Sequence, residues 1–415
     1  MPFLETLKKR GLLAQSSHEN ELLELLTKDT SKKIAIYCGF DPTAKSLHIG
    51  NLAALLVLRR AQDYGLKPII LFGGATALIG DPTGRKDMRP MNNPERISQY
   101  IENFKNQVLK FFNTDAHNVP MIVNNYDWFQ GISFLDFLRD VGIHFTIPRL
   151  LAAEVNKSRF KEGGLTFMEL GYQLLQAYDF LHLNKEYNCL IQVGGDDQWS
   201  NVLAGADLIR RVSKRKAFAL TTPLIVDHEG RKLGKTEGNA IWLDKNLLSS
   251  YEFFQFFRNR HDNDIEHMLR VFTLLEDDII QEKKKELAVN QFKEFMAYEI
   301  TKFVHGQDDA DKALETSKKL FQKDSKVSDL ESVPTSFFQQ ELFEKGLGVL
   351  DLMVHCKLCA SKGEARRLIL GGGIKIFDTK VIDPHLTIFY KDFKDNMLLI
   401  KKGKKSFHVA KIEQS

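Results

Sequence analysis

Cysteine, net charge and long apolar runs are all scarce in this 415-residue sequence. Four cysteines are too few for a disulfide framework, and nothing in their spacing requires them to pair, which favours a reducing compartment. No stretch approaches the roughly 18 consecutive apolar residues of a transmembrane helix. Charged side chains interrupt the apolar residues near the N-terminus, so neither a secretory signal nor a targeting leader is expected. The sequence therefore predicts a cytoplasmic globular protein with no membrane partner.

The net charge is only +4, from 58 lysines and arginines against 54 aspartates and glutamates. This near balance argues against a wholly polycationic nucleic-acid binder. The charge is unevenly distributed, because residues 346–415 carry 13 basic and 7 acidic side chains whereas the preceding 345 residues carry 45 and 47. A basic C-terminal segment is typical of contact with a polyanion, although a solvated basic face explains the charge alone equally well.

The first half of the sequence alternates short β-rich runs with helical stretches, which indicates an α/β fold with a parallel sheet. The predicted strands are 33–40, 68–72, 190–193 and 224–226, and the predicted helices include 52–64 and 201–211. In open sheets of this class, ligands bind beyond the carboxyl ends of the strands. We therefore expect the functional site in the loops that follow residues 40 and 193.

Beyond residue 246 the pattern becomes helical, at 251–258, 265–275 and 282–304, which predicts a helical domain over 247–321. Residues 322–347 are polar and contain Pro334, so they are predicted to be a linker. Residues 348–415 are predicted to form a small α+β domain. In it, a cap at 361–364 begins a short basic helix that ends at the glycines 371–373.

The loop after the first predicted strand places a hydroxyl, an imidazole and a glycine at the start of a helix: Thr43, His48 and Gly50. Backbone N–H groups and the helix dipole favour phosphate at such a position. A glycine there also lets a nucleotide approach the backbone closely. A histidine in this position equally serves as a plain helix cap, and the triplet alone does not decide between the two.

A second glycine-rich loop, 230–236, ends in Gly-Lys-Thr but is not a P-loop. Its leading glycine is one residue too close, and the following segment, 237–242, has no helical pattern. Its lysines, Lys232 and Lys235, suit it to close over a polyphosphate and neutralise the charge of a transition state. A plain basic hairpin is the alternative.

Polar residues also recur where an α/β core is usually apolar. Tyr172, Gln176 and Asp179 are spaced so that they share one face of a helix. A carboxylate such as Asp179 among apolar neighbours needs a partner, which either a ligand or a structural ion pair supplies. Cys356 and Cys359 have the spacing of zinc ligands, but the sequence offers no second cysteine pair, so no metal site is expected.

Together these motifs resemble the bacterial-type tyrosyl-tRNA synthetases, which are class I enzymes with two signature loops. Residues 37–51 and 232–236 resemble the two loops, and residues 348–415 resemble the family's S4-type RNA-binding module. The segments that resemble its amino-acid and nucleotide pockets are 78–84, 124–128, 172–179 and 194–199. Two features depart from the family pattern. Asn51 replaces a frequent histidine, and the second loop reads Lys-Leu-Gly-Lys-Thr instead of Lys-Met-Ser-Lys-Ser.

The resemblance implies a Rossmann-like catalytic domain over 1–246, a helical anticodon-binding domain over 247–321 and an S4-like domain over 348–415. It also implies a dimerisation insertion at about 125–165 and a mobile loop at 230–239. In the implied reaction, tyrosine and ATP give tyrosyl adenylate and pyrophosphate, and the tyrosyl group then passes to the 3′-terminal ribose of its tRNA. A substrate oxygen attacks in both steps, so no enzymic nucleophile is needed.

The resemblance further implies roles for individual residues. The residues implied to bind the nucleotide are Gly39, Asp41, Thr43, His48, Gly50, Asn51, Gly195 and Asp197. The residues implied to bind the departing pyrophosphate are Lys232, Lys235 and Thr236, with Arg85, Lys86 and Arg89 as further cations. Thr43, His48, Asn51 and the three pyrophosphate residues form the implied catalytic set. For tyrosine, Tyr37 and Asp179 bind the phenol, Asp81, Tyr172 and Gln176 hold the ammonium group, and Asn125 and Gln198 complete the site. Magnesium is expected mainly on the phosphates of ATP.

The implied partners are tRNA(Tyr) and a second copy of the chain, with no DNA. The residues implied to meet tRNA phosphates are Lys362, Arg366, Arg367, Lys401, Lys402, Lys404 and Lys405. Apolar residues within 134–148 suit a dimer interface, although core packing explains them equally well. No editing domain is expected, because a pocket with paired polar groups for a phenol already rejects phenylalanine. Tyrosyl-tRNA synthetases are a known example of this discrimination.

Three other readings remain open from the sequence. A tryptophanyl-tRNA synthetase shares the fold and both loops, but it is not expected to pair Tyr37 with Asp179. A small nucleotidyltransferase shares the first loop but is usually far shorter. A noncatalytic RNA-binding derivative of a synthetase is disfavoured by the retained His48 and lysines. Tyrosine-dependent exchange of pyrophosphate into ATP separates these readings.

Overall fold

The computed structural model describes residues 2–27, 34–83, 93–161, 164–226, 229–230, 233, 235–236, 239–320, 333–403 and 406–413. The chain forms two compact units. The first contains Met1–Leu247 and His261–Lys285, and the second contains Leu248–Arg260 and Glu286–Ser415. This division differs from the predicted one, because the helical pattern places His261–Lys285 in the helical domain, whereas the segment groups with the first unit.

The described part of the first unit is built on a six-stranded sheet with the order β1-β6-β5-β2-β3-β4. All neighbouring strands are parallel except β1 and β6. The strands are β1 (Gln15–Ser16), β2 (Ala35–Phe40), β3 (Lys67–Phe72), β4 (Met121–Asn124), β5 (Cys189–Gly195) and β6 (Phe218–Thr222). The chain passes from β2 to β3 on one side and later reaches β5 on the other, so the strand order reverses at β2. The predicted α/β fold is confirmed, and a crevice is expected at this reversal.

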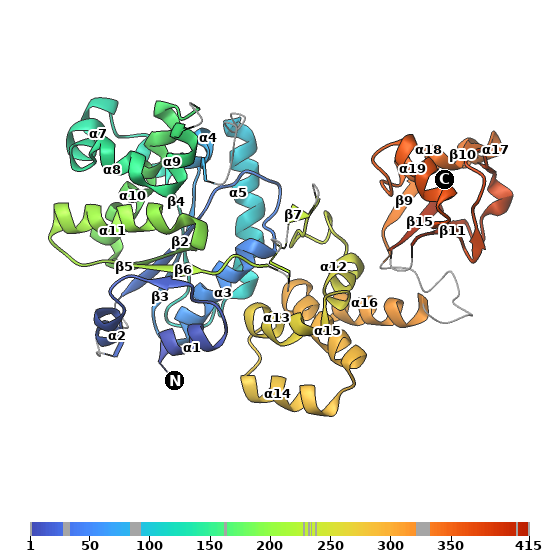
Figure 1. Cartoon of the computed structure of the whole chain (residues 1–415), viewed down its shortest axis with the longest axis horizontal. Helices are drawn as coiled ribbons and strands as arrows, with labels where there is room; N and C mark the ends of the chain where they lie inside the picture. The colour runs from blue at the N-terminus through green and yellow to red at the C-terminus, as the bar shows by residue number, and fades with distance from the viewer. Residues whose placement is uncertain are drawn as a thin grey trace. The chain divides into compact units, whose positions relative to one another are not determined.

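Helices α10 (Phe167–Tyr187) and α11 (Trp199–Ser213) cover one face of this sheet, and α3 (Ile49–Asp63) and α5 (Pro94–Val108) cover the other (Figure 1). Tyr37 of β2 packs on Phe180 of α10 with ring centroids 5.2 Å apart. On the opposite face, Phe72 of β3 meets Phe104 of α5 edge to face at 5.8 Å. Because both faces are covered, the central strands are buried along nearly their whole length.

Shorter helices complete the described part of the first unit. They are α1 (Phe3–Lys9), α2 (Glu19–Thr27), α4 (Thr76–Ile79), α6 (Tyr126–Phe129), α7 (Phe134–Asp140), α8 (Ile147–Ala152), α9 (Glu154–Lys161), α13 (Ile265–Phe272) and α14 (Asp277–Glu286). Two buried arginines attach the α13 segment. Arg10 donates to the carbonyl oxygen of Arg270 at 3.2 Å, and Arg60 donates to that of Thr273 at 2.8 Å. These bonds satisfy carbonyls at the end of α13, which explains why the segment belongs to this unit.

Two predicted elements are wrong. Leu224 and Ile225 lie outside any strand, and the strand of this region is β6, just upstream. Pro223 follows β6 directly and cannot donate to a sheet ladder. The helix predicted over 282–304 is two helices, α14 and α15 (Val289–His305). The backbone N–H of Ala288, between them, donates to the Gln291 side chain at 3.1 Å and so begins α15.

The second unit begins with helices that pack around aromatic and aliphatic side chains. Its helices here are α12 (Ser250–Arg258), α15 and α16 (Gln307–Leu320). Phe253, Phe257 and Ile300 are fully buried. Gln255 of α12 also donates to the hydroxyl of Ser317 of α16 at 2.8 Å. None of the helices in the described ranges is long and apolar enough to cross a bilayer.

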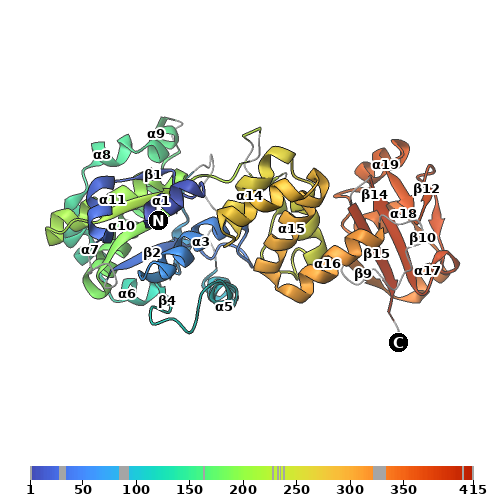
Figure 2. The same ribbon diagram turned by 90° about the horizontal axis from the view of Figure 1, so that it is seen from below.

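The C-terminal domain, residues 333–413, contains a five-stranded sheet with the order β12-β11-β14-β15-β9, beside helices α18 and α19 (Figure 2). Its elements are β9 (Thr335–Phe338), α17 (Gln340–Glu344), β10 (Leu347–Gly348), α18 (Val349–His355), α19 (Lys362–Leu370), β11 (Ile374–Ile376), β12 (Thr379–Lys380), β13 (Thr387–Ile388), β14 (Met397–Lys402) and β15 (Ser406–Ile412). Strand β9 pairs in parallel with β15, although its residues lie within the predicted linker 322–347. The domain therefore begins earlier than predicted. The predicted basic helix is confirmed, since Ser361 caps α19 and Gly371 ends it.

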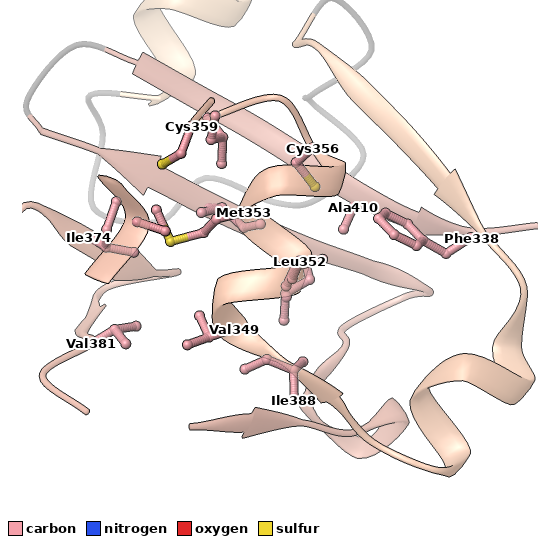
Figure 3. Close-up of a cluster of buried hydrophobic side chains, with 14 of the residues drawn as sticks. Phe338, Val349, Leu352, Met353, Cys356, Cys359, Ile374, Val381, Ile388 and Ala410 are labelled. Carbon is pink, nitrogen blue, oxygen red and sulfur yellow. The ribbon is translucent and has the colours of Figure 1, made fainter. Parts of the chain in front are cut away.

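Cys356 and Cys359 lie in the hydrophobic core of this domain, among Leu352, Met353 and Ile374 (Figure 3). Burial raises the pKa of the Cys356 thiol to about 12, so it stays protonated at neutral pH. A metal ligand must be a thiolate, which this environment disfavours. Within the part of the chain that the structure describes, no three His, Cys, Asp or Glu side chains group as a metal site would require.

We predict that Cys356→Ala lowers the free energy of unfolding by about 1 kcal/mol, because it removes one packed sulfur atom. Cys356→Ser should cost more, about 1–3 kcal/mol, since it buries a hydroxyl. A strong chelator should leave the melting temperature unchanged. Thermal denaturation of the three proteins with and without chelator measures this. A melting temperature that falls with chelator would contradict the packing role.

Candidate active site

The first signature segment joins β2 to α3, and its histidine caps that helix. The His48 ring accepts a hydrogen bond at Nδ1 from the Gly50 N–H at 3.1 Å. The Asn51 side chain accepts from the His48 N–H at 3.0 Å, which completes a reciprocal cap. The helix cap that the sequence offers as an alternative is therefore present, and it orients both side chains implied for catalysis. Gly50 cannot be replaced freely, because a Cβ there would lie 2.9 Å from Cε1 of the His48 ring.

A short hairpin at the second signature loop is followed by residues that pair with the first signature segment. Strand β7 (Lys235–Thr236) pairs with β8 (Asn239–Ala240), so this Gly-Lys-Thr run does not begin a helix as a P-loop does. Trp242 then forms an antiparallel bridge with His48. The exit of the second loop is thus hydrogen-bonded to the first. Lys232, Arg85, Lys86 and Arg89 lie outside the described residues.

A buried hydroxyl and a buried carboxylate meet between β2 and α10. The Tyr37 side chain is only 1% exposed, and among the described residues its hydroxyl has no hydrogen-bond partner. Burial and, after it, the nearby Asp179 carboxylate raise the pKa of Tyr37 well above its ordinary value, so the phenol stays protonated. Burial raises the pKa of Asp179 too, against the opposing effect of its hydrogen-bond donors.

Two N–H donors hold the Asp179 carboxylate. Asn125 donates from Nδ2 to Oδ2 at 3.0 Å, and Trp128 donates from Nε1 to Oδ1 at 3.0 Å. The Trp128 indole is itself stacked on the His182 ring, with centroids 4.3 Å apart. Each carboxylate oxygen accepts one of these bonds and retains a lone pair for a ligand. Asp179 is therefore fixed in place while keeping capacity for a further donor.

The same network continues to Asp41 at the end of β2. The Thr76 hydroxyl accepts from Asn125 at 3.1 Å and donates to Oδ1 of Asp41 at 2.7 Å. The Tyr172 hydroxyl donates to Oδ2 of Asp41 at 2.8 Å. Gly73 is required beside it, because a Cβ there would lie 2.0 Å from Oδ1 of Asp41. Polar groups from β2, α4 and α10 are thereby joined.

A second polar cluster lies at the end of β5. Gln198 donates to Oδ2 of Asp81 at 2.8 Å and accepts from Asn201 at 3.0 Å. Gln176 of α10 has a buried side-chain oxygen with no hydrogen-bond partner in the part of the chain that the structure describes. Gly195 sits close to Asp197, since a Cβ there would lie 2.8 Å from Oδ1 of that residue. Gly39 and Thr43 belong to β2 and to the loop after it.

The sequence interpretation missed two residues of this network, Thr76 and Trp128. Trp128 ends one of the segments that resemble the family's pockets, but its contact with Asp179 spans 51 residues of chain. The position of Thr76, after the glycines that follow β3, is its only signal in the sequence. Next to the site, Asp196 accepts from Gln15 of β1 at 2.7 Å and from Thr221 of β6 at 2.8 Å, so it joins these two strands to the end of β5.

Five of the seven basic residues implied to meet tRNA lie in the described part of the C-terminal domain, and they fall into two groups. Arg366 and Arg367 are exposed on α19. Lys362 pairs with Asp351 at 2.6 Å and Lys401 with Asp378 at 2.9 Å. Lys402 donates to the Leu358 carbonyl oxygen at 2.6 Å and lies 3.4 Å from Glu364. Lys404 and Lys405 lie outside the described residues.

Family models match nearly the whole chain. Residues 28–322 match the model described as tRNA synthetases class I (W and Y), and residues 328–410 match the tyrosine–tRNA ligase SYY-like C-terminal domain. The second match includes β9, which agrees with the early start of the C-terminal domain.

Two individual bacterial proteins are similar to the chain over nearly its whole length. The chain is 44% identical to a tyrosine–tRNA ligase of Acetivibrio thermocellus, over 98% of both chains. It is 43% identical to the tyrosine–tRNA ligase of Clostridium tetani, over 99% of this chain and 98% of the relative.

Among solved structures, a C-terminally truncated mitochondrial tyrosyl-tRNA synthetase of Aspergillus nidulans matches with a TM-score of 0.68 and 31% identity. The match covers 77% of this chain and 94% of that one. A tryptophanyl-tRNA synthetase of Encephalitozoon cuniculi, 16% identical with a TM-score of 0.55 over 79% of this chain and 89% of that one, shares the fold. Because identity above two fifths extends over almost the full length of its bacterial relatives, this chain belongs to the tyrosine–tRNA ligases of the class I synthetases.

Proposed function

We propose that this chain charges tRNA(Tyr) with L-tyrosine in two steps at the site around β2, α3 and α10. In the first, a carboxylate oxygen of tyrosine attacks the α-phosphorus of ATP, the bond to the β-phosphate breaks and pyrophosphate leaves. In the second, a ribose hydroxyl at the tRNA 3′ end attacks the tyrosyl carbonyl carbon, and AMP leaves as that hydroxyl loses its proton. Substrate oxygens attack in both, so the protein positions groups and stabilises charge.

The observation that supports tyrosine best is the unpartnered Tyr37 hydroxyl beside Asp179. A buried hydroxyl without a hydrogen bond costs free energy that a suitable ligand recovers. A phenol O–H supplies both missing partners, because it donates to the Asp179 carboxylate and accepts from Tyr37. Phenylalanine would leave these groups unpaired, so no editing activity is expected. Tyrosyl-tRNA synthetases are a known example of discrimination by this effect.

The remaining groups suit the rest of the two substrates. Asp81, Tyr172 and Gln176 are proposed to hold the ammonium group, with Asn125 acting through Asp179 and with Asp41 and Gln198 near the carboxylate or adenylate. Gly39, Thr43, His48, Gly50 and Asn51 are proposed to face the phosphates and ribose, with Gly195 and Asp197. Lys232, Lys235 and Thr236 are proposed to close on pyrophosphate, aided by Arg85, Lys86 and Arg89. Magnesium would be held mainly by phosphate oxygens.

Tyr37→Phe tests the phenol-binding role, because it removes only the hydroxyl. We expect kcat/KM for tyrosine in pyrophosphate exchange to fall roughly tenfold to hundredfold, the equivalent of about 1–3 kcal/mol for one buried hydrogen bond. The KM for ATP should change little.

Tyr251→Phe is the matched control. The Tyr251 hydroxyl is likewise buried with no hydrogen-bond partner among the described residues, but it lies on α12. Its removal should leave tyrosine kinetics unchanged. Equal losses in the two variants would reject the assignment of Tyr37, and exchange that depends on tryptophan instead of tyrosine would reject the proposed substrate.

The exposed arginines of α19 are proposed to meet tRNA phosphates. We expect the double variant Arg366→Ala/Arg367→Ala to bind tRNA more weakly. The slope of log K against log salt concentration should fall in size by about one for each phosphate that the variant no longer neutralises. Tyrosine-dependent pyrophosphate exchange should be unaffected, because it needs no tRNA. Filter binding across a salt series measures the first effect, and an unchanged slope would count against the proposed role of these arginines.

We also propose that the chain works as a homodimer. The predicted insertion, 125–165, carries large apolar side chains on its surface: Phe134, Leu135, Ile143 and Ile147 are 63%, 76%, 75% and 55% exposed. Such a cluster is typical of a protein interface. The bacterial relatives and the role of charged tRNA in translation support a cytoplasmic location.

Leu135→Asp/Ile143→Asp should convert a dimer to a monomer at micromolar concentration, because a paired interface would bury four carboxylates. Sedimentation velocity measures this. Ile382→Asp is the control, since Ile382 is 72% exposed in the C-terminal domain and should leave the sedimentation coefficient unchanged. A wild-type chain that sediments as a monomer would refute the homodimer.

A further inference from the structure

Gln107 of α5 is a buried polar side chain with no role in the reaction described above. It is 7% exposed, and its side-chain oxygen accepts hydrogen bonds from the Leu47 N–H at 3.0 Å and the Ser46 hydroxyl at 3.1 Å. Leu47 immediately precedes His48. Only the carbonyl end of the amide can accept a backbone N–H, so the Leu47 contact fixes how the Gln107 side chain is oriented.

The segment it holds has no regular structure of its own. Residues 41–47 are neither helix nor strand, so their geometry depends on individual hydrogen bonds. Three consecutive N–H groups have defined acceptors here: Leu47 donates to Gln107, His48 donates to Asn51, and Ile49 donates to the Ile241 carbonyl at 3.0 Å. Of these acceptors, Asn51 belongs to the first signature segment, Ile241 follows the second, and the Gln107 side chain comes from a separate helix, α5.

The contact also links α5 to the segment after the second signature loop. The Ser46 hydroxyl, which meets Gln107, accepts from the Asp244 N–H at 3.2 Å. The Leu243 N–H donates to the Leu47 carbonyl at 2.8 Å. One helical turn before Gln107, Asn103 donates to the Lys45 carbonyl at 3.2 Å. The backbone at 45–49 is therefore held between α5 on one side and residues 241–244 on the other.

We propose that Gln107 is a positioning residue for the nucleotide half of the reaction. It sets the backbone that carries His48 toward the phosphates and joins that backbone, through Ser46, to the exit of the second loop. The inference rests on the proposed roles of His48 and of the lysine loop. This residue acts on the nucleotide and not on tyrosine, because among the described residues the Asp179 carboxylate is held by Asn125 and Trp128 and not by Gln107.

Gln107→Leu tests this, since leucine fills much of the same space and cannot accept the Leu47 N–H. We expect kcat/KM for ATP in tyrosine-dependent pyrophosphate exchange to fall roughly tenfold to hundredfold, as for a buried donor left unpaired. The dissociation constant of tyrosine, measured by equilibrium dialysis without ATP, should stay within about twofold of wild type.

Gln62→Leu is the matched control. Gln62 is also a buried glutamine, and its side-chain oxygen accepts a backbone N–H, that of Asn113, at 2.9 Å. It holds a different loop, so its loss should lower the melting temperature without changing the kinetics for ATP. Equal effects of the two variants on kcat/KM for ATP, or unchanged ATP kinetics in Gln107→Leu, would overturn the inference.

Ser46→Ala provides a second route if Gln107→Leu does not fold. It removes the hydroxyl that joins Gln107 to Asp244 and should weaken the kinetics for ATP in the same direction, with tyrosine binding intact; unaltered ATP kinetics would overturn the inference. Wild-type enzyme without tyrosine-dependent exchange would instead reject the proposed function, so the two failures are distinguishable.

Discussion

The buried Asp179 carboxylate is the constraint on which the polar network between β2 and α10 depends. A buried carboxylate must be hydrogen-bonded, and among the described residues neutral N–H groups of Asn125 and Trp128 do this. Asn125 is in turn fixed by the Ala75 N–H at 2.7 Å and by its bond to Thr76. The ends of β3 and β4 and the middle of α10 are thus held together by polar contacts. Among the described residues of this site, the Tyr37 hydroxyl and the Gln176 side-chain oxygen are the buried groups left without a hydrogen-bond partner, and the proposed ligand would supply one to Tyr37.

The start of α3 follows a different principle. The nucleotide proposed to bind there brings several negative charges, which call for oriented N–H groups and cations more than for a buried carboxylate. The cap formed by His48 and Asn51 gives α3 an ordered start, and Trp242, downstream of the second signature loop, bridges to His48. Hydrogen bonds to backbone groups, such as the one that Gln107 accepts, therefore set the geometry here. This explains why Asn51 suits the position, since the cap uses its side-chain oxygen.

Local patterns predict the parts of the fold and site that depend on local spacing. Tyr172, Gln176 and Asp179 do lie on one helix, as their spacing indicates. The roles of Thr76 and Trp128 are not predictable, because their partners are 35 and 51 residues away along the chain. The sequence predicts a linker where β9 lies, because β9 is a partly exposed edge strand and its pairing with β15 is long-range. Tertiary contacts, and not local propensity, decide these cases.

The basic surplus of the C-terminal domain does not translate directly into phosphate contacts. Lys362 and Lys401 form exposed or partly exposed ion pairs, which are worth little, so either lysine can exchange its carboxylate for a phosphate at small cost. Lys402 is different, because its ammonium group also satisfies the Leu358 carbonyl between α18 and α19. Moving it to a ligand would leave that carbonyl unpaired. The number of phosphate contacts proposed for this domain is therefore smaller than its number of basic side chains, and Arg366 and Arg367 of α19 are exposed and suited to make them.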